Sequence, residues 1–353
     1  MSSHTARSLT IVASLAAGLS AHAGLRVVAS VPGSDINVPS SNAADTVTFS
    51  GVADPIAGFG VTGLFTAPVA DQIDGLYPWS VDFQVTATAP GGASATSPSP
   101  WFGDVSFADY PVADAFGGYA GVSGDGTWQL AFDSGVIPPY VAGLREVTYH
   151  LLAAAPDVEY LYSDNTGQGH SWSRPYYIAG VSGLGPVDYH TLEFTVDVSG
   201  LYHFQSVLAT GGDHFTFLYE AAFDDTQPLA NLVEYGLGNG FSPFNVPRGT
   251  SRFDQLLFAG TTYYWVTSEW QASSPPADFT NTITGPGTVT PAGAGCNPAD
   301  VAEPHGVLDL ADVQAFTAAF VSGDPLADLA PPAGVLDLAD VQTFIASFVA
   351  GCP

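Results

Sequence analysis

The sequence predicts a mainly β protein, with two antiparallel, jelly-roll-like β-sandwiches followed by a small helical module. Three observations predict this class. Runs of alternating apolar and polar residues recur between turn clusters, in a chain of 353 residues with 39 glycines and 27 prolines. No helical pattern of ten or more residues precedes the C-terminal sixth. That last part contains one 28-residue unit written twice, which is an internal repeat.

Residues 1–23 have the features of a secretory signal peptide. Arg7 precedes an apolar stretch from Leu9 to Leu19, and Ala21-His22-Ala23 forms a small-x-small cleavage site. The stretch is too short to span a bilayer as a permanent helix, and a retained anchor is the alternative. No later segment is long and apolar enough to span a membrane. We therefore expect export to an extracellular or cell-surface location.

The chain is strongly acidic, with a formal net charge of -28 at pH 7 and only six basic residues, all arginine. Such a surface repels phosphate backbones and anionic lipid headgroups. This excludes nucleic-acid binding. The sequence leaves open whether the charge serves a salty medium, solubility or the storage of divalent cations.

The two expected sandwiches span residues 24–156 and 157–287, which suits the usual size of a domain. Segments such as Thr127–Phe132 alternate as a half-buried strand does. The boundary is placed at the small-residue break Ala155-Pro156-Asp157. A small-residue linker, 288–295, should separate the sandwiches from the module at 296–353.

Four strand-like phrases stand out in the second expected sandwich: Phe194–Tyr202, Phe215–Tyr219, Pro228–Leu232 and Ala259–Val266. Together they resemble the β-sandwich modules of the pre-peptidase C-terminal type, which follow the catalytic domains of secreted bacterial peptidases. The resemblance implies an accessory role in binding, folding or secretion, without catalysis.

Each copy of the repeat carries three aspartates at the same offsets, and eighteen of the 28 aligned positions are identical. A glycine, Gly306 or Gly334, lies between the first two aspartates, where a loop around a cation needs a sharp turn. An apolar stripe at helical spacing begins directly after the second aspartate. A loop with oxygen ligands at both ends, followed by a helix, is the half EF-hand arrangement. We therefore expect two Ca²⁺ sites, with the ligands Asp300, Asp309 and Asp312 in one and Asp328, Asp337 and Asp340 in the other.

An alternative needs no metal. Asp309 would be the N-cap of a helix and Asp312 an acid in its first turn. This alternative leaves Asp300, Asp328 and the paired glycines unexplained. The expected apolar stripe consists of Leu310, Val313, Phe316 and Phe320 and their counterparts Leu338, Val341, Phe344 and Phe348.

The duplicated Gly-Val-Leu-Asp-Leu-Ala-Asp core, bracketed by Gly295-Cys296 and Gly351-Cys352, resembles a GC-type dockerin of planctomycete secreted proteins. The resemblance implies a calcium-dependent module that attaches its protein to a cohesin-like receptor on a scaffold or cell surface. Two departures predict weak affinity for calcium. Asp300 to Asp312 spans thirteen residues instead of twelve, and Ala302 and Ala330 replace the third-position ligand.

Cys296 and Cys352 are the only cysteines and flank the repeat. Because export leads to an oxidising compartment, we expect a disulfide between them, with pairing to another molecule as the alternative. On the helices, a partner should meet an apolar patch. Its expected members are Leu310, Ala311, Thr317, Leu338, Ala339 and Ile345.

Catalytic motifs are missing from the sequence: there is no Gly-x-Ser-x-Gly, no His-Glu-x-x-His and no phosphate-binding glycine loop. Trp172 and Trp270, in Ser- and Pro-rich segments, are candidates for stacking on a sugar ring, with burial in the core as the alternative. We therefore expect a secreted, non-catalytic protein that binds a glycan or a protein. The alternatives are an extracellular hydrolase of polysaccharide or peptide, and a structural component of the cell envelope.

Overall fold

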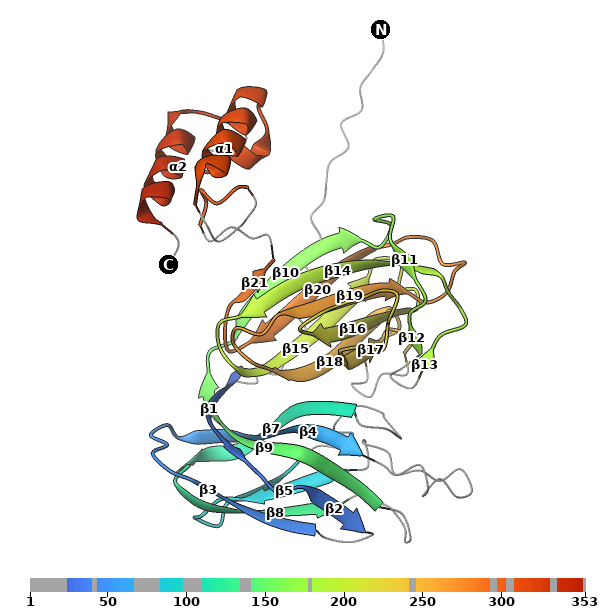
Figure 1. Cartoon of the computed structure of the whole chain (residues 1–353), viewed down its shortest axis with the longest axis vertical. Helices are drawn as coiled ribbons and strands as arrows, with labels where there is room; N and C mark the ends of the chain where they lie inside the picture. Colours follow the sequence, from blue (N-terminus) through green and yellow to red (C-terminus); the bar gives the residue numbers. More distant parts are fainter. Residues whose placement is uncertain are drawn as a thin grey trace.

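The computed structural model describes residues 24–39, 43–66, 83–97, 110–133, 141–176, 180–240, 246–292, 297–302, 308–330 and 335–351. This part of the chain is mainly β, as predicted, and ends in a pair of helices (Figure 1). The predicted signal peptide, residues 293–295 of the linker, Gly306, Gly334 and both cysteines lie outside the described residues. Within the described residues, no helix has the length and apolar character needed to cross a membrane.

In the described residues, the first sandwich has nine antiparallel strands in two facing sheets. One sheet contains β1, β9, β4 and β7, with β2 beside β9, and the other has the order β3-β8-β5-β6. The strands are β1 Gly24–Pro32, β2 Ile36–Pro39, β3 Ala43–Phe49, β4 Ile56–Thr66, β5 Gln84–Thr88, β6 Ser94–Thr96, β7 Tyr110–Val122, β8 Gly126–Asp133 and β9 Val141–Ala155. In β8, buried Trp128, Leu130 and Phe132 alternate with exposed residues, which confirms the predicted alternation. The rings of Phe59 and Trp128 meet across the layers, with 5.5 Å between centroids.

In the second sandwich, one sheet contains β10, β20, β15 and β18. The facing sheet has the order β11-β14-β19-β16-β17, and β21 pairs with β14. The strands of this sandwich are β10 Val158–Asn165, β11 Ser171–Trp172, β14 Val187–Val196, β15 Gly200–Leu208, β16 His214–Glu220, β17 Leu232–Leu237, β18 Thr250–Leu257, β19 Tyr263–Glu269, β20 Asp278–Gly285 and β21 Val289–Pro291, and β12 Pro175–Tyr176 and β13 Gly180–Val181 form a short hairpin. Phe204 and Trp265 meet in its core at 5.1 Å.

Strand β1 belongs to both sandwiches. It pairs with β9 along its length and, at its start, with β15 through Leu25↔Leu201 and Arg26↔Gly200. A nine-stranded sheet therefore runs through both halves of the molecule (Figure 1). Gly200 is required at this crossing, since a Cβ there would lie 2.3 Å from the Leu25 carbonyl oxygen. The sequence offered no signal for this shared strand.

The C-terminal module contains α1 Leu310–Ser322 and α2 Leu338–Ala350, with the short 3₁₀ turn η3 Pro325–Ala327 between them. Buried Phe316 and Phe344 stack face to face, with 4.1 Å between centroids, and hold the helices together. The predicted stripe is wrong at its first position, because Leu310 and Leu338 are exposed. At about 100° per residue, Leu310 lies roughly 60–120° away from the other stripe residues around the helix.

Candidate metal and docking sites in the C-terminal module

Both helices begin at an aspartate that caps the helix. Asp309 and Asp337 have extended backbones and accept hydrogen bonds at Oδ1 from the N–H groups of Ala311 and Ala339, at 2.6 and 2.7 Å. The third residue of each helix makes the reciprocal hydrogen bond. Asp312 Oδ2 accepts from the backbone N–H of Asp309 at 2.9 Å, and Asp340 Oδ2 from that of Asp337 at 2.7 Å. These are two capping boxes, which satisfy N–H groups that a helix start leaves without partners.

The same two third-position aspartates also hold the preceding loops. Asp312 Oδ1 accepts from the N–H groups of Val301 and Ala302, both at 2.9 Å. Asp340 Oδ1 accepts from those of Leu329 and Ala330, both at 2.8 Å, in the second copy. Asp312 and Asp340 are fully buried. Each buried carboxylate therefore binds three backbone N–H groups.

Backbone N–H groups also control the charge of Asp340. The N–H of Asp337 contributes most, followed by those of Ala330 and Leu329, and together they hold the pKa of the Asp340 carboxyl below its ordinary value although its desolvation acts in the opposite direction. These N–H groups therefore favour the ionised form of the carboxylate.

Two of the six predicted calcium ligands, Asp312 and Asp340, are poorly suited to that role. Calcium takes about six to eight oxygen ligands at roughly 2.3–2.6 Å, whereas a carboxylate has about four lone-pair sites. In Asp312 and Asp340, N–H groups occupy three of these sites. Within the described part of the chain, no group of three or more His, Cys, Asp or Glu residues is placed to hold a metal ion. Residues 303–307 and 331–334 lie outside it, so the calcium prediction is untested there.

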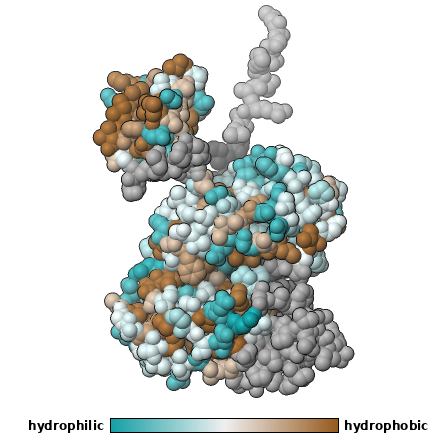
Figure 2. All heavy atoms as spheres, in the orientation of Figure 1, coloured by the Kyte–Doolittle hydropathy of each residue, from teal (hydrophilic) through white to brown (hydrophobic). Residues whose placement is uncertain are grey.

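The module exposes an unusual amount of apolar surface. Of the fourteen large hydrophobic side chains that are exposed in the described chain, seven belong to this small module. They are Leu310, Val321, Leu326, Val335, Leu338, Ile345 and Val349. Figure 2 shows the brown, hydrophobic residues gathered over the helix pair. Of the predicted partner-binding residues, Leu310, Thr317, Leu338 and Ile345 are exposed, whereas Ala311 and Ala339 are half-buried.

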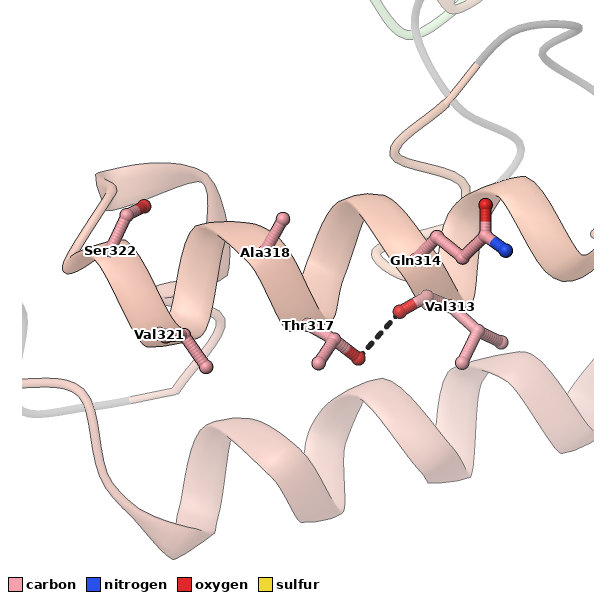
Figure 3. A pocket seen from close by; sticks show the side chains of 6 residues that line it. All are labelled: Val313, Gln314, Thr317, Ala318, Val321 and Ser322. Carbon is pink, nitrogen blue, oxygen red and sulfur yellow. Dashed lines mark hydrogen bonds between the residues drawn. The ribbon is translucent and has the colours of Figure 1, made fainter.

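A shallow hollow of about 500 Å³ runs along α1 (Figure 3). It is lined by Val313, Gln314, Thr317, Ala318, Val321 and Ser322. The hydroxyl of Thr317 donates a hydrogen bond to the Val313 carbonyl oxygen at 2.6 Å, so it is satisfied within the helix. In the second copy, Ile345 takes the place of Thr317 and Ala350 that of Ser322. The residues of α2 that correspond to the lining of the hollow are therefore all apolar except Gln342.

The predicted sugar platform is wrong at Trp172. Trp172 is buried, donates its indole N–H to Ser268 Oγ at 2.9 Å, and packs edge-on against Phe217. Trp270 is half-buried and stacks on Phe215 with 5.0 Å between centroids. Arg174 lies against the same two rings and donates to the Trp270 carbonyl oxygen. The segment is therefore tied to the core, and the ligand role of Trp270 stays a prediction.

The histidines of the two sandwiches have different surroundings. His150 and His214 are buried, and burial lowers the pKa of each to about 4. His203 Nδ1 lies 2.8 Å from Asp254 Oδ1 across β15 and β18. Nearby, half-buried Glu234 has its pKa raised to about 8, chiefly by desolvation. Since His150 and His214 are inaccessible, they are unsuited to act on a substrate.

Comparison with known proteins does not identify the chain. No family model matches it, and no curated protein matches it. Among solved structures, it is similar to the N-terminal CBM22-1–CBM22-2 tandem domain of Paenibacillus barcinonensis Xyn10C, at 11% identity and a TM-score of 0.21, covering 70% of this chain and 83% of that one. It is also similar to Arthrobacter globiformis T6 isomalto-dextranase complexed with panose, at 13% identity and a TM-score of 0.21, covering 71% and 35%. Such low scores carry no argument about function.

Proposed function

We propose that the chain is an exported, non-catalytic binding protein that is attached through its C-terminal module to a protein receptor on an extracellular scaffold or cell surface. One observation carries the proposal: a module of fewer than 60 residues holds half of the exposed large hydrophobic side chains of the described chain. Exposed apolar patches of this kind mark sites of protein interaction. The dockerin-like repeat makes a cohesin-like receptor the expected partner.

The charge of the module indicates the chemistry of that partner. Residues 296–353 contain eight acidic residues and neither lysine nor arginine. Asp309 and Asp337, at the helix starts, are exposed next to Leu310 and Leu338. A receptor should therefore present an apolar groove with a basic rim, which would steer association and weaken it at high salt.

In this proposal, the two sandwiches are the cargo that binds a glycan or another protein. Their shared strand β1 suits that role, because a sheet that continues through both halves holds them in a fixed orientation. A ligand could then contact both sandwiches without a cost for ordering a hinge.

Retention on the surface of the cells that export the protein tests the docking proposal. Leu338→Asp and Ile345→Asp in one variant place charge on the exposed face of α2 without touching the Phe316–Phe344 stack. We expect this variant to be released into the medium. The matched control is Val207→Asp, on an exposed position of β15, which should be retained like the wild type. Equal retention of all three proteins would contradict docking through the module.

A further inference from the structure

We propose that the C-terminal module folds and holds its two helices without calcium, because Asp312 and Asp340 bind backbone N–H groups where a half EF-hand would bind the ion. Folding of the module without calcium and docking of the module to a receptor are separate properties, and each can be present without the other.

The first support is the agreement between the two copies. In each, Oδ1 of the third-position aspartate binds two successive N–H groups of the loop, and Oδ2 binds the N–H of the capping residue. All six distances lie between 2.7 and 2.9 Å. The start of the loop is thus fastened to the start of the helix through the carboxylate, which is the connection that a bound ion supplies in an EF-hand.

The second support is the chemistry of the loop. Ala302 and Ala330 occupy the position of a side-chain ligand, and their N–H groups point to a carboxylate oxygen. In the second copy, residues 331–334 read Pro-Pro-Ala-Gly and have no side-chain oxygen. In the sequence of that loop, Asp328, Asp337 and Asp340 are therefore the only residues whose side-chain oxygens could bind a metal ion. The cap and the N–H cluster already engage the last two.

The third support is electrostatic. A buried carboxylate needs compensation, and three charge-assisted hydrogen bonds to N–H groups provide it. The positive end of the helix dipole, at the same N-terminus, adds to this stabilisation. No residual requirement for a cation remains at Asp312 or Asp340.

Hydrogen exchange on the full exported chain tests the inference, with peptides that cover residues 308–330 and 335–351 compared in millimolar calcium and in chelator. We expect the amide protection of both helices to agree within about twofold between the two conditions. A loss of about tenfold or more in chelator would overturn the inference.

Two matched variants separate the roles of the carboxylates. Asp340→Asn places an NH₂ group among three N–H donors, so we expect protection of α2 to fall in both conditions. Asp337→Asn replaces the carboxylate of a predicted calcium ligand with a neutral amide, which binds calcium more weakly, but keeps a good N-cap, so it should leave protection and the heat of calcium titration unchanged. If Asp337→Asn lowered protection in calcium but not in chelator, the aspartate would be a metal ligand and the inference would be wrong.

Discussion

Acid should destabilise both sandwiches through two buried histidines. In the first, His150 contacts Ser30 Oγ through Nδ1 at 2.8 Å and Thr62 Oγ1 through Nε2 at 3.0 Å. In the second, His214 contacts Ser206 Oγ through Nε2 at 3.2 Å. Burial lowers the pKa of both imidazoles from the ordinary value of 6.5 to about 4. Both rings are therefore neutral in the folded protein above about pH 4.

The size of the effect follows from proton linkage. Between about pH 6.5 and 4 these two histidines bind protons in the unfolded chain but not in the folded chain. Their contribution to the free energy of unfolding is therefore complete above pH 6.5 and is lost as the pH falls toward 4. At about pH 5 the pH lies roughly 1.5 units below the unfolded pKa of each histidine. At 1.36 kcal/mol per unit, each sandwich should lose about 2 kcal/mol.

Urea unfolding at about pH 7.5 and about pH 5 measures this loss. The comparison is with His214→Gln, which keeps an amide that can bond Ser206 but does not titrate. Because both proteins share all their carboxylates, the difference between their pH responses isolates the imidazole. We expect the wild-type second sandwich to lose about 2 kcal/mol more than the variant. Equal losses in the two proteins would refute the reasoning.

Two substitutions and a change of pH test the contacts that stabilise the fold. Phe344→Ala removes half of the stack with Phe316 and should cost about 3–5 kcal/mol, enough to abolish amide protection in the module while the neighbouring Ile345→Ala preserves it; protection in both variants would contradict this. Arg174→Met removes the donors to two carbonyl groups and should destabilise the second sandwich by about 3 kcal/mol in urea, an unchanged midpoint being the contrary result. Because the pKa of Asp340 is lowered, its contribution to stability is complete above the unfolded value of about 3.9 and is lost as the pH falls below it. The amide protection factors of α2, corrected for the intrinsic exchange rate at each pH, should therefore fall on acidification. Asp340→Asn should lack this fall.

Local signals predicted much of the architecture. The alternation of Thr127–Phe132 marked β8, and the spacing of Val313, Phe316 and Phe320 marked α1. The capping roles of Asp309 and Asp312 were also readable, since an aspartate followed three residues later by an acid is a helix-start signal. These features depend on residues that are close in sequence.

Features that depend on distant pairing were not predictable. Trp172 lies in a polar segment, yet it is buried because β11 pairs with β14, whose Val187 is fifteen residues away. The double pairing of β1 depends on β15, more than 170 residues along the chain. The hydrogen bonds from the N–H groups of Ala302 and Ala330 to Asp312 and Asp340 were not predictable either. A pattern of side chains does not show where a backbone N–H group points.

Photo-crosslinking tests the central claim, docking through the C-terminal helices, most directly. A photoreactive phenylalanine would replace Ile345 on α2 or, as a matched exposed position on β10, Leu161. We predict a discrete protein adduct from position 345 on the surface of the exporting cells, present in chelator as well as in calcium, and none from position 161. Adducts from position 161 alone, or none from position 345 in either condition, would contradict the account.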